Sequence, residues 1–399
     1  RREADEANKP AEVEAIEAFL FSQAEFRHNV ITHHCEIRWT EEAGFLPLTD
    51  RDVNTLWGRM NKTVGRVYLT DIYNVIHSEF VPLFNPFQSY FDHLPSWDGV
   101  SDPIGDLADT VHVKSDQAEF RDYFRKWFVG ILPALLDDTV VNHEILVLIG
   151  EQGLYKTTWF NFLLPPELRC YFYTKTNSDR LNKDDLFSLT EFALICFEEL
   201  DGMRPAELNQ LKAMVTMPYV NERAAYGRNK ERHPHIASFC GTGNNVQFLT
   251  DPTGNRRWLP FEVSQIRDPH QHAIPYELVY SQAYALWKSG FCHWFSQEEI
   301  RVLNTHNSRF EVPNLEEDLI RTHFRKPFEG ETGIFVTAAD ILEQISSCLR
   351  YPLSPNKIGR IMAGLEFESI RYKGKRGYIT VKKTGEDIDR ERRSGALGL

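Results

Sequence analysis

The residues from Leu146 to Thr158 have the types and the order that triphosphate binding requires. An apolar stretch ends at Ile149 and is followed by a glycine-containing loop, a Lys-Thr-Thr sequence and a helical pattern. Backbone N–H groups of such a loop and of the helix N-terminus bind phosphate oxygens. The lysine adds a point charge, and the threonine hydroxyl can bind Mg²⁺. The segment therefore predicts a site for ATP and Mg²⁺ built from Gly150, Gly153, Tyr155, Lys156, Thr157 and Thr158.

Tyr155 departs from the usual pattern of this loop. Glycine is favoured immediately before the lysine, because the backbone must approach phosphate closely there. The segment alone therefore leaves open an ordinary strand–turn–helix that happens to contain Lys-Thr. If the loop does bind phosphate, the tyrosine ring could crowd it and slow hydrolysis.

A second apolar stretch, Phe192–Phe197, ends in the acidic sequence Glu198-Glu199-Leu200-Asp201. Carboxylates at a strand tip beside a phosphate loop hold Mg²⁺ and orient the attacking water. We expect Glu198 on the metal side and Glu199 as the base that polarises water, with Asp201 as the substitute candidate. The alternative interpretation is a solvated helix cap.

Two further polar elements follow strand-like stretches. Gly241-Thr242-Gly243 leads to Asn244, whose amide can hydrogen-bond a γ-phosphate or the attacking water. A Pro/Gly turn at 251–254 then presents Arg256 and Arg257, whose guanidinium groups fit phosphate oxygens and stay charged. We predict that Asn244 senses the nucleotide and that the arginines contact it across a subunit boundary. A simple Gly-Asn turn and a surface arginine pair are the alternatives.

The remaining chain predicts the elements that position these groups. With 399 residues the chain is too long for one core, so we expect two or three domains. Residues 1–140 predict a mostly helical region, with helical spacing over Ala11–Phe26 and Gln117–Leu136. Apolar strands and helices then alternate over 141–310, which is the pattern of an α/β domain. A third domain is expected at 311–384, in which Thr332–Lys383 predicts strand, helix, helix, strand, turn, strand, and the tail at 385–399 is expected to fray.

Composition narrows the function classes. The net charge of −12 argues against a general nucleic-acid binder, but residues 354–383 contain eight basic and two acidic side chains. No apolar run reaches the ~18–20 residues that cross a bilayer, and no secretory signal is visible, so we expect a cytoplasmic protein without a membrane partner. The six cysteines show no Cys-x-x-Cys pair and no zinc spacing, which indicates reduced thiols.

Two stretches could contact DNA. Residues 221–235 combine basic and aromatic side chains, which can follow a phosphate backbone and stack on bases. The helix expected at 354–365 and the hairpin at 370–379 suit major-groove and backbone contacts. The predicted contacts are Arg223, Arg228, Lys230, Arg232, Lys357, Arg360, Lys373, Lys375 and Arg376. A solvated loop, and a C-terminal module used only for protein contacts, are the alternatives.

Taken in this order, the polar elements resemble the virulence-associated protein E family. That family is related to superfamily 3 helicases and D5-like primase-helicases of phages and mobile elements. The resemblance covers about Phe84 to Val263, and the run from Leu249 to Arg257 is its most specific part. The other matching segments are Tyr90–Gly99, Gly150–Thr158, Phe197–Asp201 and Gly241–Asn244. Tyr155 is the departure from the family pattern.

The resemblance implies an AAA+-type P-loop ATPase core, preceded by the mostly helical region and followed by a small winged-helix domain. It implies Mg²⁺ as cofactor, a homo-oligomeric ring that is often a hexamer, and translocation along single-stranded DNA in the ring channel during replication of a mobile element. Residues 221–235 would then project into that channel.

Other function classes remain open at this point. One is a nucleotide-gated DNA-binding or assembly protein with little turnover, and another is a defence or regulatory ATPase switch. Residues 1–140 lack an obvious carboxylate cluster for polymerase metals, so we expect no primase activity in this chain.

Overall fold

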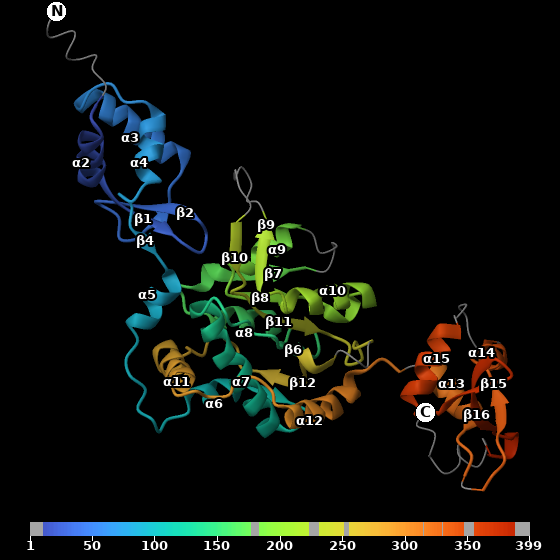
Figure 1. Ribbon diagram of the computed structural model, residues 1–399. Coiled ribbons are helices and arrows are strands. Elements are labelled where there is room, and N and C mark those ends of the chain that lie inside the picture. The colour runs from blue at the N-terminus through green and yellow to red at the C-terminus, as the bar shows by residue number, and fades with distance from the viewer. Residues whose placement is uncertain are drawn as a thin grey trace, which may run out of the picture. The chain divides into compact units, whose positions relative to one another are not determined.

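The computed structural model describes residues 11–176, 183–222, 231–250, 255–313, 315–328, 330–346 and 355–387. The chain divides into two compact units, Arg1–Glu311 and Val312–Leu399. Figure 1 shows the helices and strands of both units. Among the described helices, none combines the length and the apolarity that a membrane span needs.

The amino-terminal part of the first unit has a small sheet and a hydrophobic cluster of its own. Its strands lie in the order β3-β2-β1-β4. The cluster runs from Ile16 to Val81 and holds the helices against the sheet. The elements are α2 (Val13–Gln23), β1 (Ala24–Asn29), β2 (His34–Trp39), β3 (Leu46–Pro47), α3 (Asp50–Thr63), α4 (Leu69–Ile76) and β4 (Leu83–Phe84).

The first helix is shorter than its spacing predicts. The helical pattern extends to Phe26, whereas α2 ends at Gln23 and the next six residues form β1. Ala24 and Phe26 are buried and Glu25 is exposed, so burial alternates with the period of two that marks a strand. The antiparallel pairing of β1 with β2 satisfies the backbone along this stretch. Tertiary pairing therefore overrides a local helical pattern here.

The central sheet of the first unit carries the polar elements singled out above. Its strands lie in the order β5-β12-β6-β11-β8-β7. The strands from β12 to β7 are parallel, and β5 pairs antiparallel with β12. The strands are β5 (Val111–Val113), β6 (Ile145–Ile149), β7 (Phe172–Lys175), β8 (Leu194–Phe197), β11 (Ser238–Gly243) and β12 (Trp258–Ile266). Because parallel strands run in one direction, the segments after β6, β8 and β11 emerge at the same edge.

Helical layers bury both faces of β6. Its even-numbered residues belong to one cluster with α7 and α8, and its odd-numbered residues to another with α10. A strand buried on both faces reads as a continuous apolar run, as this one does. The mixed α/β class expected from the sequence is confirmed. The accompanying elements are α5 (Pro86–Asp92), α6 (Pro103–Ala108), α7 (Gln117–Leu136), α8 (Lys156–Leu163), α9 (Lys183–Glu191), α10 (Pro205–Val215), β9 (Tyr219–Glu222), β10 (Glu231–Pro234), α11 (Tyr276–Lys288) and α12 (Gln297–Asn307).

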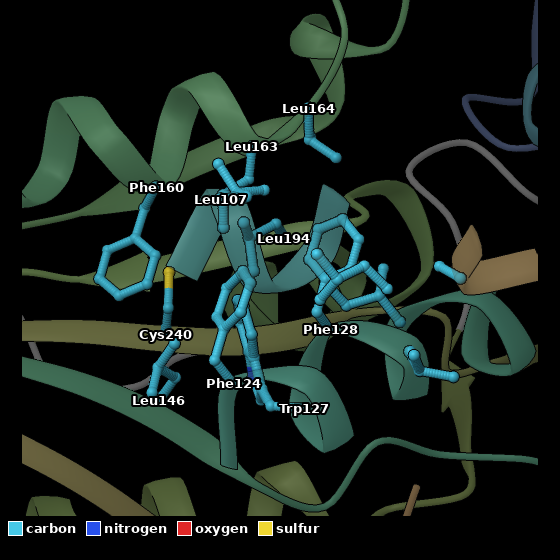
Figure 2. Packing of buried hydrophobic residues seen from close by; sticks show 14 of the residues in the cluster. Leu107, Phe124, Trp127, Phe128, Leu146, Phe160, Leu163, Leu164, Leu194 and Cys240 are labelled. Carbon is cyan, nitrogen blue, oxygen red and sulfur yellow. The ribbon is translucent and has the colours of Figure 1, made fainter. Parts of the chain in front are cut away.

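Helix α7 has the bounds that its apolar stripe predicts, and it supports the central sheet. Its start is capped by the Asp116 carboxylate, which accepts hydrogen bonds from two first-turn N–H groups. Figure 2 shows Trp127 and Phe128 of this helix packed with residues of the sheet and α8. The Trp127 Nε1–H donates to the carbonyl of Phe239 in β11 over 2.9 Å. The boundary expected at residue 140 would assign α7 to the amino-terminal region. In the structure, α7 packs with the central sheet.

Over residues 332–383 the described elements of the second unit follow the order expected from the sequence, and α13 and β13 precede them. The Thr337 hydroxyl accepts a hydrogen bond from the N–H of Asp340 and so caps α14. Lys373 and Gly374 have positive φ values of 48° and 79° and form the tight turn between β15 and β16. The elements are α13 (Leu315–His323), β13 (Phe324–Arg325), β14 (Ile334–Val336), α14 (Ala338–Ser346), α15 (Pro355–Gly364), β15 (Ser369–Tyr372) and β16 (Lys375–Lys382).

The packing of α7 leads to a stability prediction. Phe128 is fully buried and its ring packs against Tyr280 of α11, so its replacement by Ala leaves a cavity in the core around α7. We expect Phe128→Ala to lower the free energy of unfolding by about 3–5 kcal/mol, measured by urea denaturation. Phe21→Ala is the matched control, because that ring is 78% exposed and its loss should cost less than about 0.5 kcal/mol. Equal losses in the two variants would contradict the assignment of α7 to the core.

Candidate functional site

A cavity of about 460 Å³ lies where β6, β8 and β11 end. It joins the glycine-containing loop, the acidic strand tip and the turn after β11, which are far apart in the sequence. Its lining residues are Gln152, Gly153, Leu154, Tyr155, Lys156, Thr157, Thr158, Glu198, Glu199, Thr242, Gly243 and Asn244. The fold therefore brings most of the expected nucleotide-site residues together around one space.

The loop between β6 and α8 is held close to the neighbouring strands. The Gly150 N–H donates to the carbonyl of Gly243 over 3.1 Å. A Cβ atom on Gly150 would lie 2.9 Å from the carbonyl oxygen of Val263, so a larger residue would push the loop away from the sheet. Gly153 has a φ of 89°, which a residue with a side chain rarely adopts. Both glycines are thus required by the backbone path, although Gly150 itself does not line the cavity.

Tyr155 has the backbone conformation of a glycine. It immediately precedes α8, with φ 61° and ψ 18° in the left-handed region. For a residue with a side chain this conformation costs about 1–2 kcal/mol. The ring is 42% exposed at the cavity, so packing compensates only part of this cost. The preference for glycine at this position therefore has a conformational reason in addition to close approach.

Lys156 is buried at the base of the loop. Its ammonium group donates to the carbonyl oxygens of Gly150 and Glu151 over 2.6 and 2.8 Å, and it lies 3.4 Å from the Oδ1 atom of Asn244. Burial lowers the pKa of this lysine, and the Asp201 carboxylate opposes that shift. Backbone carbonyl groups of the loop thus surround the positive charge of Lys156.

The acidic strand tip contacts the start of α8. The Thr157 hydroxyl donates to the Oε1 atom of Glu198 over 2.8 Å. Glu199, the next residue, has a φ of 54° and is exposed at the cavity. The two glutamates therefore differ in position: Glu198 contacts the Thr157 hydroxyl, and Glu199 is an exposed residue of the cavity lining.

Some site residues were missed by the sequence reasoning. Gln152, Leu154, Thr242 and Gly243 line the cavity, and each lies inside a motif segment of which other members were predicted. Asp201, considered as a substitute acid, lies instead against the backbone of the turn after β11. Whether such a residue lines the cavity depends on the path of the backbone, which residue type alone does not predict.

Arg256 and Arg257 lie outside the cavity. They precede Trp258 of β12, which pairs with Ile145 at the amino end of β6, whereas the cavity lies at the carboxyl end. The length of β6 separates the two sites by roughly 15 Å, at about 3.3 Å per residue. Arg256 is exposed, and Arg257 is half-buried; burial and the charge of Arg256 lower the pKa of Arg257. Within one chain, the arginines and Lys156 do not share a site.

The candidate DNA contacts of the first unit are only partly visible. Arg223, Arg228 and Lys230 fall outside the described residues. Arg232 in β10 is exposed, and its guanidinium carbon lies 3.3 Å from the centre of the Tyr219 ring.

The candidate DNA contacts of the second unit are exposed and lie on α15 and at the β15–β16 turn. On α15, Lys357 forms an ion pair with Glu316 over 2.5 Å, and Arg360 lies one turn further on. At the β15–β16 turn lie Lys373, Lys375 and Arg376, and the Arg376 Nε–H donates to the Ser369 hydroxyl over 2.8 Å. The turn presents its basic groups to solvent, whereas Lys357 would first have to leave its carboxylate partner.

A larger cavity, of about 1010 Å³, lies elsewhere in the first unit. Its walls include Arg27, which is paired with Glu36 over 2.5 Å, and several further glutamates such as Glu167 and Glu277. None of the candidate residues lines it. Its lining carries more carboxylates than cationic groups, so it does not suit a phosphate, and the smaller cavity is the candidate site.

The strained backbone at Tyr155 can be tested directly. Replacement by Gly removes the left-handed strain, so Tyr155→Gly should raise the free energy of unfolding by about 1 kcal/mol. Tyr155→Ala is the matched control, because it removes the same ring but keeps a Cβ atom at a φ of 61°. Thermal or urea unfolding compares the three proteins. If the Gly variant is no more stable than the Ala variant, the strain assignment is wrong.

Comparisons with known proteins place the chain among solved structures only at low similarity. Two apo structures of the NrS-1 C-terminal region are 11% identical to this chain, cover 93% of it and 99% of their own chains, and have TM-scores of 0.47 and 0.44. A third structure of that region is 11% identical, covers 92% and 99%, and has a TM-score of 0.46. No curated protein matches the chain.

A family comparison is more specific. The model of the virulence-associated protein E-like domain matches residues 92–312, which is more than half of the chain. The matched range includes the loop, the acidic strand tip, the turn after β11 and the arginine pair. It ends within one residue of the division between the two compact units. The chain therefore belongs to the virulence-associated protein E-like family, as the motif resemblance indicates.

Proposed function

We propose that this chain is an AAA+-type P-loop ATPase that translocates along DNA in the replication of a phage or another mobile element. One observation carries the proposal: Lys156, the Thr157–Glu198 pair and Asn244 come from three strand ends and line a single cavity. These are a phosphate-binding cation, a hydroxyl–carboxylate pair and an amide donor. The family membership supports the same class of function.

The residues at the cavity fit a magnesium nucleotide. Mg²⁺ prefers oxygen ligands, keeps several waters and uses few protein groups beside the phosphates. The Thr157 hydroxyl and the Glu198 carboxylate, 2.8 Å apart, are two such oxygens. When bound, the ion would neutralise negative charge on the phosphates. Lys156 would hold the phosphates, and the N–H groups at the start of α8 lack intrahelical partners and can do the same.

Glu199 is the best candidate for the base. It is exposed and lines the cavity, whereas Glu198 contacts the Thr157 hydroxyl on the proposed metal side and Asp201 does not line the cavity. An exposed carboxylate that lines the cavity can polarise a water beside the terminal phosphate. The Asn244 amide then fixes the phosphate or that water.

The position of the arginines favours a shared site in a ring, which could be a hexamer. Arg256 is exposed and lies at the opposite edge of the sheet from Lys156. An arginine that cannot reach the nucleotide of its own chain can reach that of a neighbour, and such a contact is worth 10³–10⁵ in rate in other NTPases. We propose this role for Arg256 and Arg257.

The second unit would serve as a winged-helix domain that contacts DNA. Its β15–β16 turn presents Lys373, Lys375 and Arg376, which suits contacts to a phosphate backbone. Residues 221–235 would contact single-stranded DNA in the ring channel. A nucleotide-gated assembly protein with little turnover is the second candidate, and the tyrosine ring at the cavity favours it.

The first test measures ATP hydrolysis by the full chain with and without single-stranded DNA. We expect DNA to stimulate hydrolysis and Lys156→Ala to reduce the rate by about 100-fold or more. Lys62→Ala is the control, because that lysine is exposed on α3 and should leave the rate unchanged. ATP binding without turnover, sensitive to Lys156→Ala, would support the assembly protein instead. An equal ATP affinity in wild type and Lys156→Ala would rule out both.

A mixing experiment tests the shared site. Lys156→Ala and Arg256→Ala should each be inactive alone, because every interface lacks one group. Mixed rings should regain part of the activity, since some interfaces combine an intact lysine with an intact arginine from the neighbour. Arg257→Ala is examined in the same way to decide between the two arginines. Mixed rings, verified by mass, that stay inactive would show that the arginine does not act across a boundary.

A further inference from the structure

The carboxylate of Asp201 is engaged by the backbone of a neighbouring strand end. Asp201 lies in the short helical turn Leu200–Gly202 that follows the acidic strand tip. Its Oδ1 atom accepts the N–H of Asn244 over 3.2 Å, and its Oδ2 atom accepts the N–H of Asn245 over 3.0 Å. One side chain thus binds two successive N–H groups beyond the end of β11.

Two glycines on β11 allow this contact. A Cβ atom on Gly241 would lie 2.2 Å from the Leu200 Cδ1 atom, and one on Gly243 would lie 3.1 Å from the Asp201 Oδ1 atom. Larger residues would therefore push the turn and its carboxylate away from the strand. The Gly-x-Gly-Asn sequence at the end of β11 has a packing reason. Its two glycines let the segment after β8 lie directly against the Asn244 turn.

The contact leads from the acidic segment to the lysine. Asp201 holds the backbone of Asn244, and the Asn244 Oδ1 atom lies 3.4 Å from the Lys156 ammonium group. Both oxygens of the Asp201 carboxylate accept backbone N–H groups, and the residue does not line the cavity. The carboxylate is therefore placed to hold the backbone of the turn after β11.

We propose that Asp201 is a positioning residue that sets the Asn244 amide relative to Lys156 and so couples the acidic strand tip to the turn after β11. For catalysis this inference rests on the proposed nucleotide site. The role requires a carboxylate, because each of its two oxygens accepts one N–H. An asparagine would turn one of them into an NH₂ donor facing an N–H group.

The structural part of the proposal can be tested without nucleotide. In Asp201→Asn, the Asn244 and Asn245 amides should exchange with deuterium at least about 10-fold faster, because at least one hydrogen bond is lost. Asp98→Asn is a matched control: Asp98 also accepts two backbone N–H groups, from Val100 and Ser101, but through one oxygen that an amide retains. Unchanged exchange at Asn244 and Asn245 in Asp201→Asn would overturn the proposal whatever the protein's activity.

The catalytic part is tested by a double-mutant cycle on ATP hydrolysis. We expect Asp201→Asn to lower kcat about 10-fold, with the nucleotide Kd within about 3-fold of wild type, and Asp98→Asn to behave as wild type. In the Asn244→Ala background, Asp201→Asn should have no further effect on kcat, because residues acting as one unit are not additive. Additive losses, or a wild-type kcat in Asp201→Asn, would overturn the proposal.

A second variant covers a folding failure, and one outcome separates this inference from the proposed function. Should Asp201→Asn fail to fold, Asp201→Ser retains one acceptor and is expected to give the same pattern of kcat and Kd. Faster exchange in Asp201→Asn, together with a wild-type protein that neither binds nor hydrolyses ATP, would support the contact and reject the nucleotide site.

Discussion

Parallel pairing of β6 with β11, and of β11 with β8, brings three strand ends to one edge of the central sheet. Each strand then delivers a different chemical group there: Lys156 after β6, Glu198 and Glu199 after β8, and Asn244 after β11. Slippage of any one strand by a residue would exchange the two buried faces that pack into different apolar clusters, and both helical layers oppose that. The register of these strands therefore determines whether the site exists.

The helical layers maintain that register. The two faces of β6 pack into separate apolar clusters, so a shift of the strand by one residue would disrupt both clusters. Helix α7 adds a directional contact, because the Trp127 indole donates to the backbone of β11. Within the site, unusual backbone conformations occur at Tyr155, immediately before α8, and at Glu199, two residues beyond the end of β8, with φ values of 61° and 54°. Rigid packing of the sheet can support such strained residues at its edge.

The distribution of charge is consistent with a division of roles between the two edges of the sheet. Lys156 and the carboxylates lie at the carboxyl edge, and Arg256 and Arg257 lie at the amino edge. Burial raises the pKa of Glu144, beside the arginines, to about 7. Asp201, placed between the acidic tip and the Asn244 turn, links two elements that both face the lysine.

Residue order alone determined the glycine-containing loop, the acidic strand tip, the asparagine turn, the arginine pair, the bounds of α7 and the α/β class, because each depends on local spacing and polarity. Only the tertiary structure decided that Ala24–Asn29 is a strand, that α7 packs with the central sheet, that Asp201 binds backbone, and that Arg256 and Arg257 lie away from Lys156. The physical reason is that strand partners and register arise from contacts between distant residues. A local pattern can place a side chain at the end of a strand, but it does not reveal which other strand ends lie beside it.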